Sequence, residues 1–276
     1  MVSIKYFSNT MKYAVLWCYA GLSLCLFAWV MLTSTKMNRE IFADPFGLPN
    51  EFSLKNYVQA WNGAHISTYF WNSILVTLAA VACTLFFTAT ISYVISRFQF
   101  RGNVLLYGIF VIGLTIPLQS LMLPTFLKME SLGLRDNLLS LIIVYTAFAI
   151  PKSVFLLVGF MKGIPAQLEE AGIVDGCSYW GIFYKIILPI SKPGLATVAI
   201  IEAIGAWNEY VYATVLISKD TLRTLPLGLA NFQGEYMSQY GLIAAGTVIT
   251  MVPVIVLYVI FQEQVVKGMV AGAVKG

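Results

Sequence analysis

Two groups of acidic residues stand out in a chain that is 59% hydrophobic and only 11% charged. Glu169, Glu170 and Asp175 fall within the stretch IPAQLEEAGIVDGCSYW, and Glu202 and Glu209 lie in a long apolar segment that follows it. Carboxylates serve proteins as general acids and bases, as metal ligands, as proton carriers and as contact points for partners. The surroundings of each group decide which of these roles is open.

Catalytic and metal-binding chemistry finds little support in the sequence. The chain has one histidine, His65, and four cysteines without a CxxC pair. Neither a Ser/His/Asp or Cys/His arrangement nor a zinc site is therefore indicated. The sequence also lacks a G-x-x-x-x-G-K-[ST] loop that would cradle phosphates. We expect a protein that is not an enzyme, with no metal and no cofactor in this chain.

The composition is typical of a membrane protein. Mean hydropathy is +0.79, and charged residues are far below the roughly one quarter found in soluble chains. A net charge of +4, spread along the chain, argues against nucleic-acid binding. A transmembrane helix needs about 20 mostly apolar residues. Six stretches meet this condition: Tyr13–Thr33, Tyr69–Ile95, Val104–Leu123, Leu138–Phe160, Gly194–Ile217 and Leu242–Gln262. We therefore expect an all-α, polytopic protein with six transmembrane helices.

The distribution of basic residues predicts the orientation of these helices. Lys5 and Lys12 precede the first span, and Arg97 and Arg101 occupy the short turn SRFQFRG, in both cases without an acidic residue. Short loops rich in Lys and Arg stay in the cytoplasm. We expect both termini to be cytoplasmic, so that the acidic stretch lies in a cytoplasmic loop at residues 160–192.

The acidic stretch itself predicts a short helix. Pro165 suits a first helical turn, and Asp175 with Gly176 supplies a turn that ends the helix. The following SYWGIFYKIILP has aromatic and apolar residues at helical spacing, which is typical of an amphipathic interfacial helix that Pro189 would end. Both a solvated loop and a docking helix for a cytoplasmic partner fit this pattern, and the small residues Ala171, Gly172 and Gly176 favour docking.

The spacing around these carboxylates resembles a known motif. Glu170-Ala171-Gly172 is followed by three residues, Gly176, nine residues and then Ile-x-Leu-Pro, ending at Pro189. This resembles the EAA motif of permease subunits in ATP-binding-cassette importers, in which a second Ala is usual where Gly172 stands. Glycine preserves close approach but loses roughly 1 kcal/mol of helix propensity.

Further segments along nearly the whole chain extend the resemblance. They are NSILVTL, ISYVISRFQFRG, GAWNEYVYA, TLPLGL and the terminal KGMVAGAVKG. Together they look like the sugar-importer branch of these permeases, similar to the second membrane subunit of maltose transporters. The resemblance implies a type I importer transmembrane domain, with residues 1–68 as an N-terminal helix and first outer loop and residues 69–276 as the core permease domain.

The resemblance also implies the partners and the coupling residues. The chain would form half of a translocation path with a second permease subunit in a heterodimer. Two copies of an ATPase would bind ATP and Mg²⁺, and an extracytoplasmic solute-binding protein would deliver a sugar or oligosaccharide, in the cytoplasmic membrane of a bacterium or archaeon. The residues implied to contact the ATPase are Leu168, Glu169, Glu170, Ala171, Gly172, Asp175 and Gly176.

Polar residues within the spans indicate a candidate path. A carboxylate in mid-membrane costs roughly 2.5–3.5 kcal/mol, so Glu202 and Glu209 should face a cavity or a partner. The expected path residues are Gln119, Ser120, Glu202, Trp207, Asn208, Glu209 and Tyr210. Helix packing alone would also account for Trp207 and Asn208, and interhelical hydrogen bonding for Gln119 and Ser120. Lys152 is either a path residue or a locally paired charge.

A proton-coupled secondary carrier is the alternative reading of the chain. It would use Glu202 or Glu209 as a proton site and would need no ATPase. It would leave the spacing of the acidic stretch without an explanation. On the outer side, the segment from Ile217 to Tyr240 is long enough to reach a binding protein, although a solvated connector fits it as well.

Overall fold

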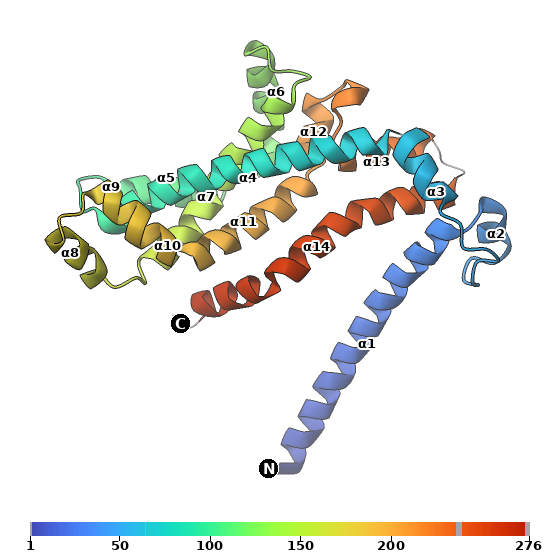
Figure 1. Ribbon diagram of the computed structural model, residues 1–276, viewed down its shortest axis with the longest axis horizontal. Helices are drawn as coiled ribbons and strands as arrows, with labels where there is room; N and C mark the ends of the chain where they lie inside the picture. Colours follow the sequence, from blue (N-terminus) through green and yellow to red (C-terminus); the bar gives the residue numbers. More distant parts are fainter. Residues whose placement is uncertain (1, 64, 236–238, 274–276) are drawn as a thin grey trace. The chain divides into compact units, whose positions relative to one another are not determined.

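A computed structural model describes the backbone of residues 2–63, 65–235 and 239–273 and the side chains of residues 11–63, 65–230 and 239–262. The described residues form helices and connecting loops without a strand (Figure 1). The chain divides into two compact units, which are described separately. The first comprises residues 1–67 and 228–252, and the second comprises residues 68–227 and 253–276.

The first unit is built around the long helix α1 (Val2–Thr35). Its other elements are α2 (Asn38–Ala43), α3 (Lys55–Val58), the π-helical turn η1 (Gln59–Gly63), most of α13 (Leu225–Glu235) and the beginning of α14 (Tyr240–Ala273). The side-chain amide of Asn56 donates to the backbone oxygens of Ser34 and Lys36, both at 2.9 Å. These bonds satisfy carbonyl groups that the end of α1 leaves free.

The second unit holds both groups of acidic residues. Its elements before α13 are α4 (Ile66–Arg97), α5 (Asn103–Gly113), η2 (Leu118–Leu121), α6 (Met122–Ser131), α7 (Leu138–Met161), α8 (Gln167–Val174), α9 (Tyr179–Ile182), η3 (Phe183–Ile187), α10 (Leu188–Ile190), α11 (Lys192–Trp207), α12 (Val211–Leu216) and η4 (Asp220–Leu222). Helix α7 contacts α5, α11 and α12 and is the central helix of the unit. Half of the most apolar 18-residue stretch of α7 is buried, a larger share than in the three other long apolar helices of the described residues.

The structure confirms an all-α protein with the apolar helices of a membrane protein. Four helices are long and apolar enough to cross a membrane: Met11–Thr35, Ile66–Arg97, Leu138–Met161 and Tyr240–Gln262. Two bent helix pairs bring the number to six if each pair counts as one span. Five of the six predicted stretches correspond to these helices and to the first bent pair. The second pair, Tyr179–Ile190 with Lys192–Trp207, overlaps the predicted stretch Gly194–Ile217 only in its second helix.

The third and fifth predicted spans are interrupted. Between α5 and η2 the chain bends by 93°, and Pro117 stands in extended backbone at the start of η2, where its missing N–H prevents the helix from continuing. The stretch predicted as Gly194–Ile217 is likewise two helices, because α11 ends at Trp207 and α12 begins at Val211. Both interruptions expose backbone groups that side chains must satisfy.

The predicted interfacial helix is also modified. Residues 179–190 form α9, a π-helical turn and α10, and the bend of 71° follows at Ser191 rather than at Pro189. Phe183 and Ile187 are buried, whereas Trp180 and Tyr184 are exposed and stack with ring centroids 6.1 Å apart. The wider π turn therefore separates aromatic residues that regular helical spacing would place on one face.

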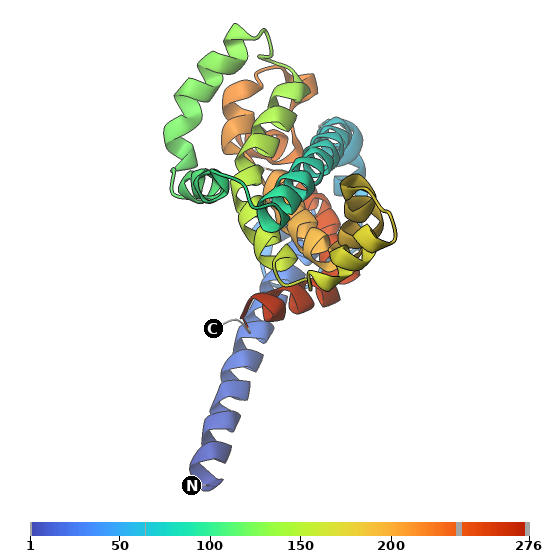
Figure 2. The ribbon, with the colours of Figure 1, turned by 90° about the vertical axis from the view of Figure 1, so that its left-hand side faces the viewer.

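The hairpin of α8 to α10 lies beside the C-terminal end of α4 in both views of the ribbon (Figures 1 and 2). Its buried residues form one hydrophobic cluster with Ala89 and Tyr93 of α4 and with Leu157 and Met161 of α7. The loop that connects α12 to α13 is tied to the start of α4, where Asn72 donates to the backbone oxygens of Thr221 and Arg223, both at 2.9 Å.

Candidate translocation cavity and coupling helix

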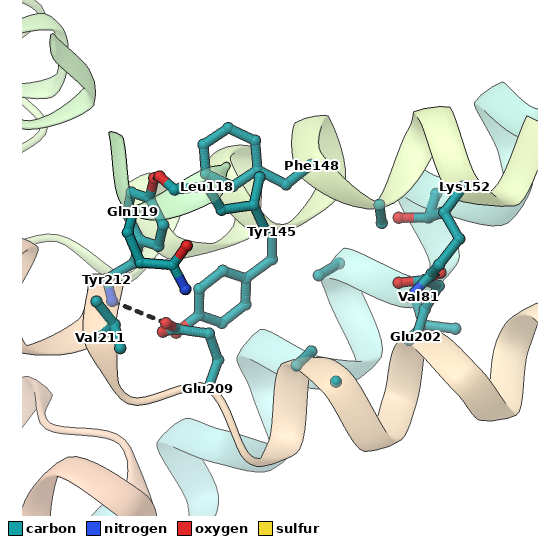
Figure 3. A pocket seen from close by; sticks show the side chains of 15 residues that line it. Val81, Leu118, Gln119, Tyr145, Phe148, Lys152, Glu202, Glu209, Val211 and Tyr212 are labelled. Carbon is teal, nitrogen blue, oxygen red and sulfur yellow. Dashed lines mark hydrogen bonds and ion pairs between the residues drawn. The ribbon is translucent and has the colours of Figure 1, made fainter. Parts of the chain in front are cut away.

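A cavity of about 240 Å³ lies within the second unit, between α4, η2, α7, α11 and α12 (Figure 3). Both polar and aromatic side chains face it, together with small apolar residues. The lining residues are Ala80, Val81, Thr84, Leu118, Gln119, Tyr145, Phe148, Ala149, Lys152, Glu202, Gly205, Ala206, Glu209, Val211 and Tyr212. Figure 3 shows two polar ends, with Gln119, Tyr145 and Glu209 at one and Lys152 and Glu202 at the other.

Glu209 closes one end of the cavity and caps α12. Its Oε1 accepts a hydrogen bond from the backbone N–H of Tyr212 at 2.8 Å, and its Oε2 accepts from the N–H of Ala213 at 3.1 Å. The hydroxyl of Tyr145 donates to the same Oε2 at 2.6 Å. The carboxylate thus satisfies two N–H groups that the start of α12 would leave free, and its negative charge suits the N-terminal end of a helix.

Glu202 stands at the other end and is held by two neighbours on α7. The ammonium of Lys152 lies 3.1 Å from its Oε1, and the Ser153 hydroxyl donates to the same oxygen at 3.0 Å. The Glu202 side chain is 9% exposed, whereas that of Lys152 is 46% exposed. Lys152 is therefore both a paired charge and a cavity residue, so the two roles that the sequence left open are not exclusive.

The structure brings three of the seven expected path residues to the cavity, namely Gln119, Glu202 and Glu209. Ser120, Trp207, Asn208 and Tyr210 are not among the lining residues. Trp207 is 2% exposed, and its ring meets that of Phe70 edge-on with centroids 5.8 Å apart. The Asn208 amide donates to the backbone oxygen of Ile204 at 2.9 Å. Trp207 and Asn208 thus pack and cap α11, which was the alternative reading of this pair.

Apart from Lys152, sequence reasoning missed the contribution of α7 to the cavity. Tyr145, Phe148 and Ala149 line it together with Lys152. Their spacing of three, four and seven residues places them on one helical face, and this signal was present in the sequence. Among the described residues, no group of three or more His, Cys, Asp or Glu side chains is placed to hold a metal ion.

Helix α8 presents most of the expected coupling residues outward. Leu168, Glu170, Ala171, Asp175 and Gly176 are exposed. Two apolar residues that the sequence analysis did not single out, Ile173 and Val174, are exposed as well, by 51% and 86%. Exposed aliphatic side chains beside carboxylates are compatible with a contact surface as well as with a solvated helix.

The two glycines have different roles: Gly172 allows close packing, and Gly176 allows a left-handed backbone conformation. Gly172 is buried, and a Cβ there would lie 2.8 Å from Cδ1 of Ile186 and 3.3 Å from Cγ1 of Ile182. It therefore lets α8 pack closely against the segment of α9, η3 and α10 (residues 179–190), which we call the arm. Gly176 has a φ of +79°, which glycine adopts without strain at the end of a helix. The prediction that the helix ends at Asp175 and Gly176 is confirmed.

Glu169 is the coupling carboxylate that turns inward. Its Oε1 lies 2.7 Å from Nε of Arg97, the last residue of α4, and the two side chains are 16% and 10% exposed. The N–H of Nε is not aligned for a hydrogen bond to this oxygen, so the contact is an ion pair. Burial raises the pKa of Glu169, and the nearby charge of Arg97 lowers it in opposition.

Comparisons with known proteins place this architecture in a family. Residues 87–270 match the model of the binding-protein-dependent transport system inner membrane component. The chain is 36% identical over 248 residues to the probable ABC transporter permease protein YurM of Bacillus subtilis, covering 90% of this chain and 82% of that protein. It is 35% identical over 239 residues to the diacetylchitobiose uptake system permease protein NgcG of Streptomyces coelicolor, covering 86% and 79%.

A solved structure has the same fold. A chain from a bacterial ABC transporter involved in the import of the acidic polysaccharide alginate superposes with a TM-score of 0.82 at 24% identity, covering 92% of this chain and 95% of that one. The relatives are named as transport permeases, which confirms that the chain is a transport subunit and not an enzyme. The family model, the relatives and the helical architecture agree, and the chain belongs to the inner membrane permease components of binding-protein-dependent ABC importers.

Proposed function

We propose that this chain is a permease subunit that imports a sugar or oligosaccharide and forms half of a translocation path. NgcG, a relative at 35% identity, is named for the uptake of a disaccharide. The observation that carries the proposal is the mixed lining of the cavity, in which Phe148, Tyr145 and Tyr212 stand beside the polar groups of Gln119 and Lys152. Sugars need both kinds of surface, because their ring faces are apolar and their hydroxyls form hydrogen bonds.

The size of the cavity supports a shared path. Complete small-molecule sites usually enclose about 300–1,000 Å³, and the cavity in this chain has about 240 Å³. A second permease subunit facing the same space would enlarge it. The cavity of this chain alone would then hold only part of an oligosaccharide.

Helix α8 is the docking element for an ATPase in this proposal. Its exposed face combines Glu170 and Asp175 with Leu168 and Val174, so that apolar contact and charge would act together. ATP and Mg²⁺ would be bound by the ATPase, two copies of which would serve the two permease subunits. ATP binding would draw the α8 helices of the two subunits together, and the attached arms would transmit this movement to the spans.

The docking role implies an orientation. If α8 faces the cytoplasm, both ends of the chain lie there too, because six spans return the chain to its starting side. The loops that contain Asp136 and Asp220 then lie outside, where a solute-binding protein would deliver the sugar. The basic turn with Arg97 and Arg101 supports this orientation.

The secondary carrier has no comparable support. It would need Glu202 or Glu209 to release and take up a proton as the path opens. Glu209 accepts three hydrogen bonds from this chain, and Glu202 is paired with Lys152. Both carboxylates therefore have a structural function in the state described.

Affinity purification from gently solubilised native membranes tests the docking. We would compare the tagged wild-type chain with Glu170→Lys/Asp175→Lys, which reverses the charge on the exposed face of α8 and leaves Gly176, whose positive φ favours glycine, untouched. Arg101→Gln, an exposed change on the neighbouring cytoplasmic turn, is the matched control. We expect an ATPase and a second permease with the wild type and the control, and loss of the ATPase alone from the α8 variant. Equal recovery of the ATPase from all three would refute the docking role.

Uptake assays test the cavity. Purified complexes in proteoliposomes, supplied with ATP inside and the co-purified binding protein outside, would be offered labelled neutral disaccharides, amino-sugar disaccharides and uronic-acid oligosaccharides. We expect uptake of one class, reduced at least tenfold by Phe148→Ala and unaffected by Phe155→Ala, an exposed ring on the same helix outside the cavity lining. Unchanged uptake in Phe148→Ala would argue against a substrate contact there.

A further inference from the structure

The guanidinium of Arg97 connects three elements at the coupling end of the second unit. Its Nη2 donates to the backbone oxygen of Met161 at 2.8 Å and to that of Ile164 at 3.0 Å. Met161 ends α7, and Ile164 lies in the turn that leads to α8. The Nε of the same group forms the ion pair with Glu169 on α8 at 2.7 Å.

The two kinds of contact differ in geometry. The bonds from Nη2 reach the carbonyl of Met161, which also accepts from the N–H of Ile164, and the carbonyl of Ile164, and they hold Arg97 against the end of α7. The contact with Glu169 is close but not aligned as a hydrogen bond. An ion pair tolerates a change of angle that a hydrogen bond does not. Arg97 is therefore held to the end of α7 by two hydrogen bonds and to α8 by an ion pair.

Neighbouring residues support the position of Arg97. The side-chain amide of Asn103 donates to the backbone oxygens of Ile95 and Phe98, at 3.0 and 2.6 Å, and so satisfies the end of α4. The ring of Phe98 meets those of Tyr93 and Tyr179 edge-on, with centroids 5.5 and 5.3 Å away. The basic turn is thus a packed support for the hairpin, and its arginines are not equivalent, because Arg101 is exposed.

We propose that Arg97 is the positioning residue that joins the coupling helix α8 to the ends of α4 and α7, so that a movement of α8 is transmitted to these two spans. Arg97 lies outside the cavity lining and its side chain is 10% exposed, so in this proposal it acts through Glu169 and the carbonyl groups of Met161 and Ile164. The role rests on the proposed docking of α8. The planar fork of arginine is required for it, because a lysine ammonium cannot span the two carbonyl oxygens and the carboxylate in the same geometry.

The test compares uptake with ATP hydrolysis in reconstituted complexes. We would prepare Arg97→Gln, Arg97→Lys, Glu169→Gln and the double variant Arg97→Gln/Glu169→Gln, with Arg101→Gln as the control. Each preparation is normalised to assembled complex, measured by the ATPase subunit that co-purifies. A residue with a merely structural function would change the yield of complex and leave uptake per complex and the ATP hydrolysed per sugar unchanged.

We expect Arg97→Gln to lower uptake per complex at least tenfold and to raise the ATP hydrolysed per sugar by a similar factor. Arg97→Lys should recover part of the uptake, and Glu169→Gln should lose about threefold, because the carbonyl contacts remain in that variant. The double variant should match Arg97→Gln within twofold, since both residues act through one contact. The control should behave as the wild type.

Three outcomes would overturn the proposal. The first is an Arg97→Gln complex with normal uptake and a normal ATP-to-sugar ratio, and the second is a double variant whose loss equals the product of the two single losses. The third outcome applies if the Arg97→Gln complex does not assemble. In that case the Glu169→Gln complex is measured instead, and a normal amount of ATP hydrolysed per sugar in that complex would overturn the proposal. Failure of the proposed docking is distinguishable, because Glu170→Lys/Asp175→Lys would then recover as much ATPase as the wild type, whatever the result for the Arg97 variants.

Discussion

The cavity and the coupling helix both place carboxylates next to an interruption of a helix, but they use them differently. In the cavity, Glu202 and Glu209 are engaged by side chains and backbone groups of the same chain. At the coupling helix, only Glu169 turns inward to a cation, while Glu170 and Asp175 are exposed. The first region uses its charges to complete its own structure, and the second leaves two of its charges accessible to a partner.

The difference follows from the solvent around each region. A polar group in the hydrocarbon interior has no water to bond with, so the chain must supply its partner. At the membrane surface water can solvate a carboxylate until a partner replaces it. The location of a carboxylate along a membrane protein is therefore a first guide to whether it has a structural or a recognition function. Four experiments test this comparison.

Glu209→Ala should have the largest effect, because it removes the acceptor of three hydrogen bonds inside the membrane domain. Each donor left without a partner costs about 1–3 kcal/mol, so we expect a loss of stability of roughly 3 kcal/mol or more. The measurement is the thermal unfolding midpoint of the detergent-solubilised protein. Glu209→Gln, which keeps one carbonyl oxygen, should lose less. A midpoint of Glu209→Ala equal to that of the wild type would make Glu209 a path residue without a structural function.

Lys152→Met should destabilise the protein by about 1–3 kcal/mol, because it leaves the charge of Glu202 without its cation. Breaking a fully buried ion pair costs about 3–5 kcal/mol, and the partial exposure of Lys152 reduces this. The double variant Lys152→Met/Glu202→Gln should recover most of the lost stability in the same unfolding assay, since no unpaired charge remains. If the double variant is less stable than Lys152→Met alone, pairing is not what holds Glu202.

Asp136, between α6 and α7, extends the comparison to a carboxylate outside the spans. Its Oδ1 accepts from the N–H groups of Lys219 and Ser218, at 2.9 and 2.5 Å. The bond from Lys219 is the largest influence that lowers the pKa of Asp136, and the bond from Ser218 acts in the same direction. Because the pKa is lower in the folded protein, this carboxylate stabilises the fold above its ordinary pKa of about 3.9, and the contribution is lost as the pH falls through the lowered value.

The corresponding variant is Asp136→Asn, which tolerates the φ of +53° at this position. We expect the wild type to be more stable than the variant by less than about 1 kcal/mol near neutral pH, since solvent screens this partly exposed site. The difference should shrink as the pH falls below the ordinary pKa of about 3.9 and through the lowered value. The measurement is the unfolding midpoint of both proteins across this range. A difference that does not change with pH would show that the charge of Asp136 is not involved.

Gly172→Ala should have the smallest effect. Alanine gains about 1 kcal/mol of helix propensity, and the approach of its Cβ to Ile186 at 2.8 Å, which requires that side chain to shift, offsets this gain. We expect a change in stability within about 0.5 kcal/mol and normal capture of the ATPase. Stability is measured by thermal unfolding and capture by affinity purification. Loss of the ATPase with normal stability would mean that Gly172 belongs to the docking face and not to the internal packing of the hairpin.

The sequence predicted the helices and their approximate bounds well, because long apolar stretches in a membrane protein have few other possibilities. Pro117 in the third span indicates a kink, and the structure has a bend of 93° between Gly113 and Leu118. The interruption of the fifth span was not predicted. Glu209 was interpreted as a path residue, and its capping of α12 depends on the position of Tyr145 on another helix. Such a contact between distant residues has no local pattern.

The candidate site was predicted in part for the same reason. Polar residues in apolar spans led to Gln119, Glu202 and Glu209, all of which line the cavity. Aromatic residues were less informative, because Trp207 packs on Phe70 while Phe148 and Tyr212 face the cavity. At the coupling helix, the local spacing predicted the turn at Gly176, but the ion pair of Glu169 with Arg97 joins residues that are 72 positions apart.

The contacts at the two ends of the second unit also set an order for its biogenesis. A chain made from its N-terminus can join Arg97 to Met161 and Ile164 after 64 and 67 further residues. At the opposite end, 82 further residues must be synthesised before Asp136 can bond with Ser218, and 152 before Ser73 can bond with Leu225. The coupling end should therefore be complete while the other end is still open. Until the translocon has released α11 and α12, the starts of α4 and α7 remain accessible to proteases and chaperones on that side.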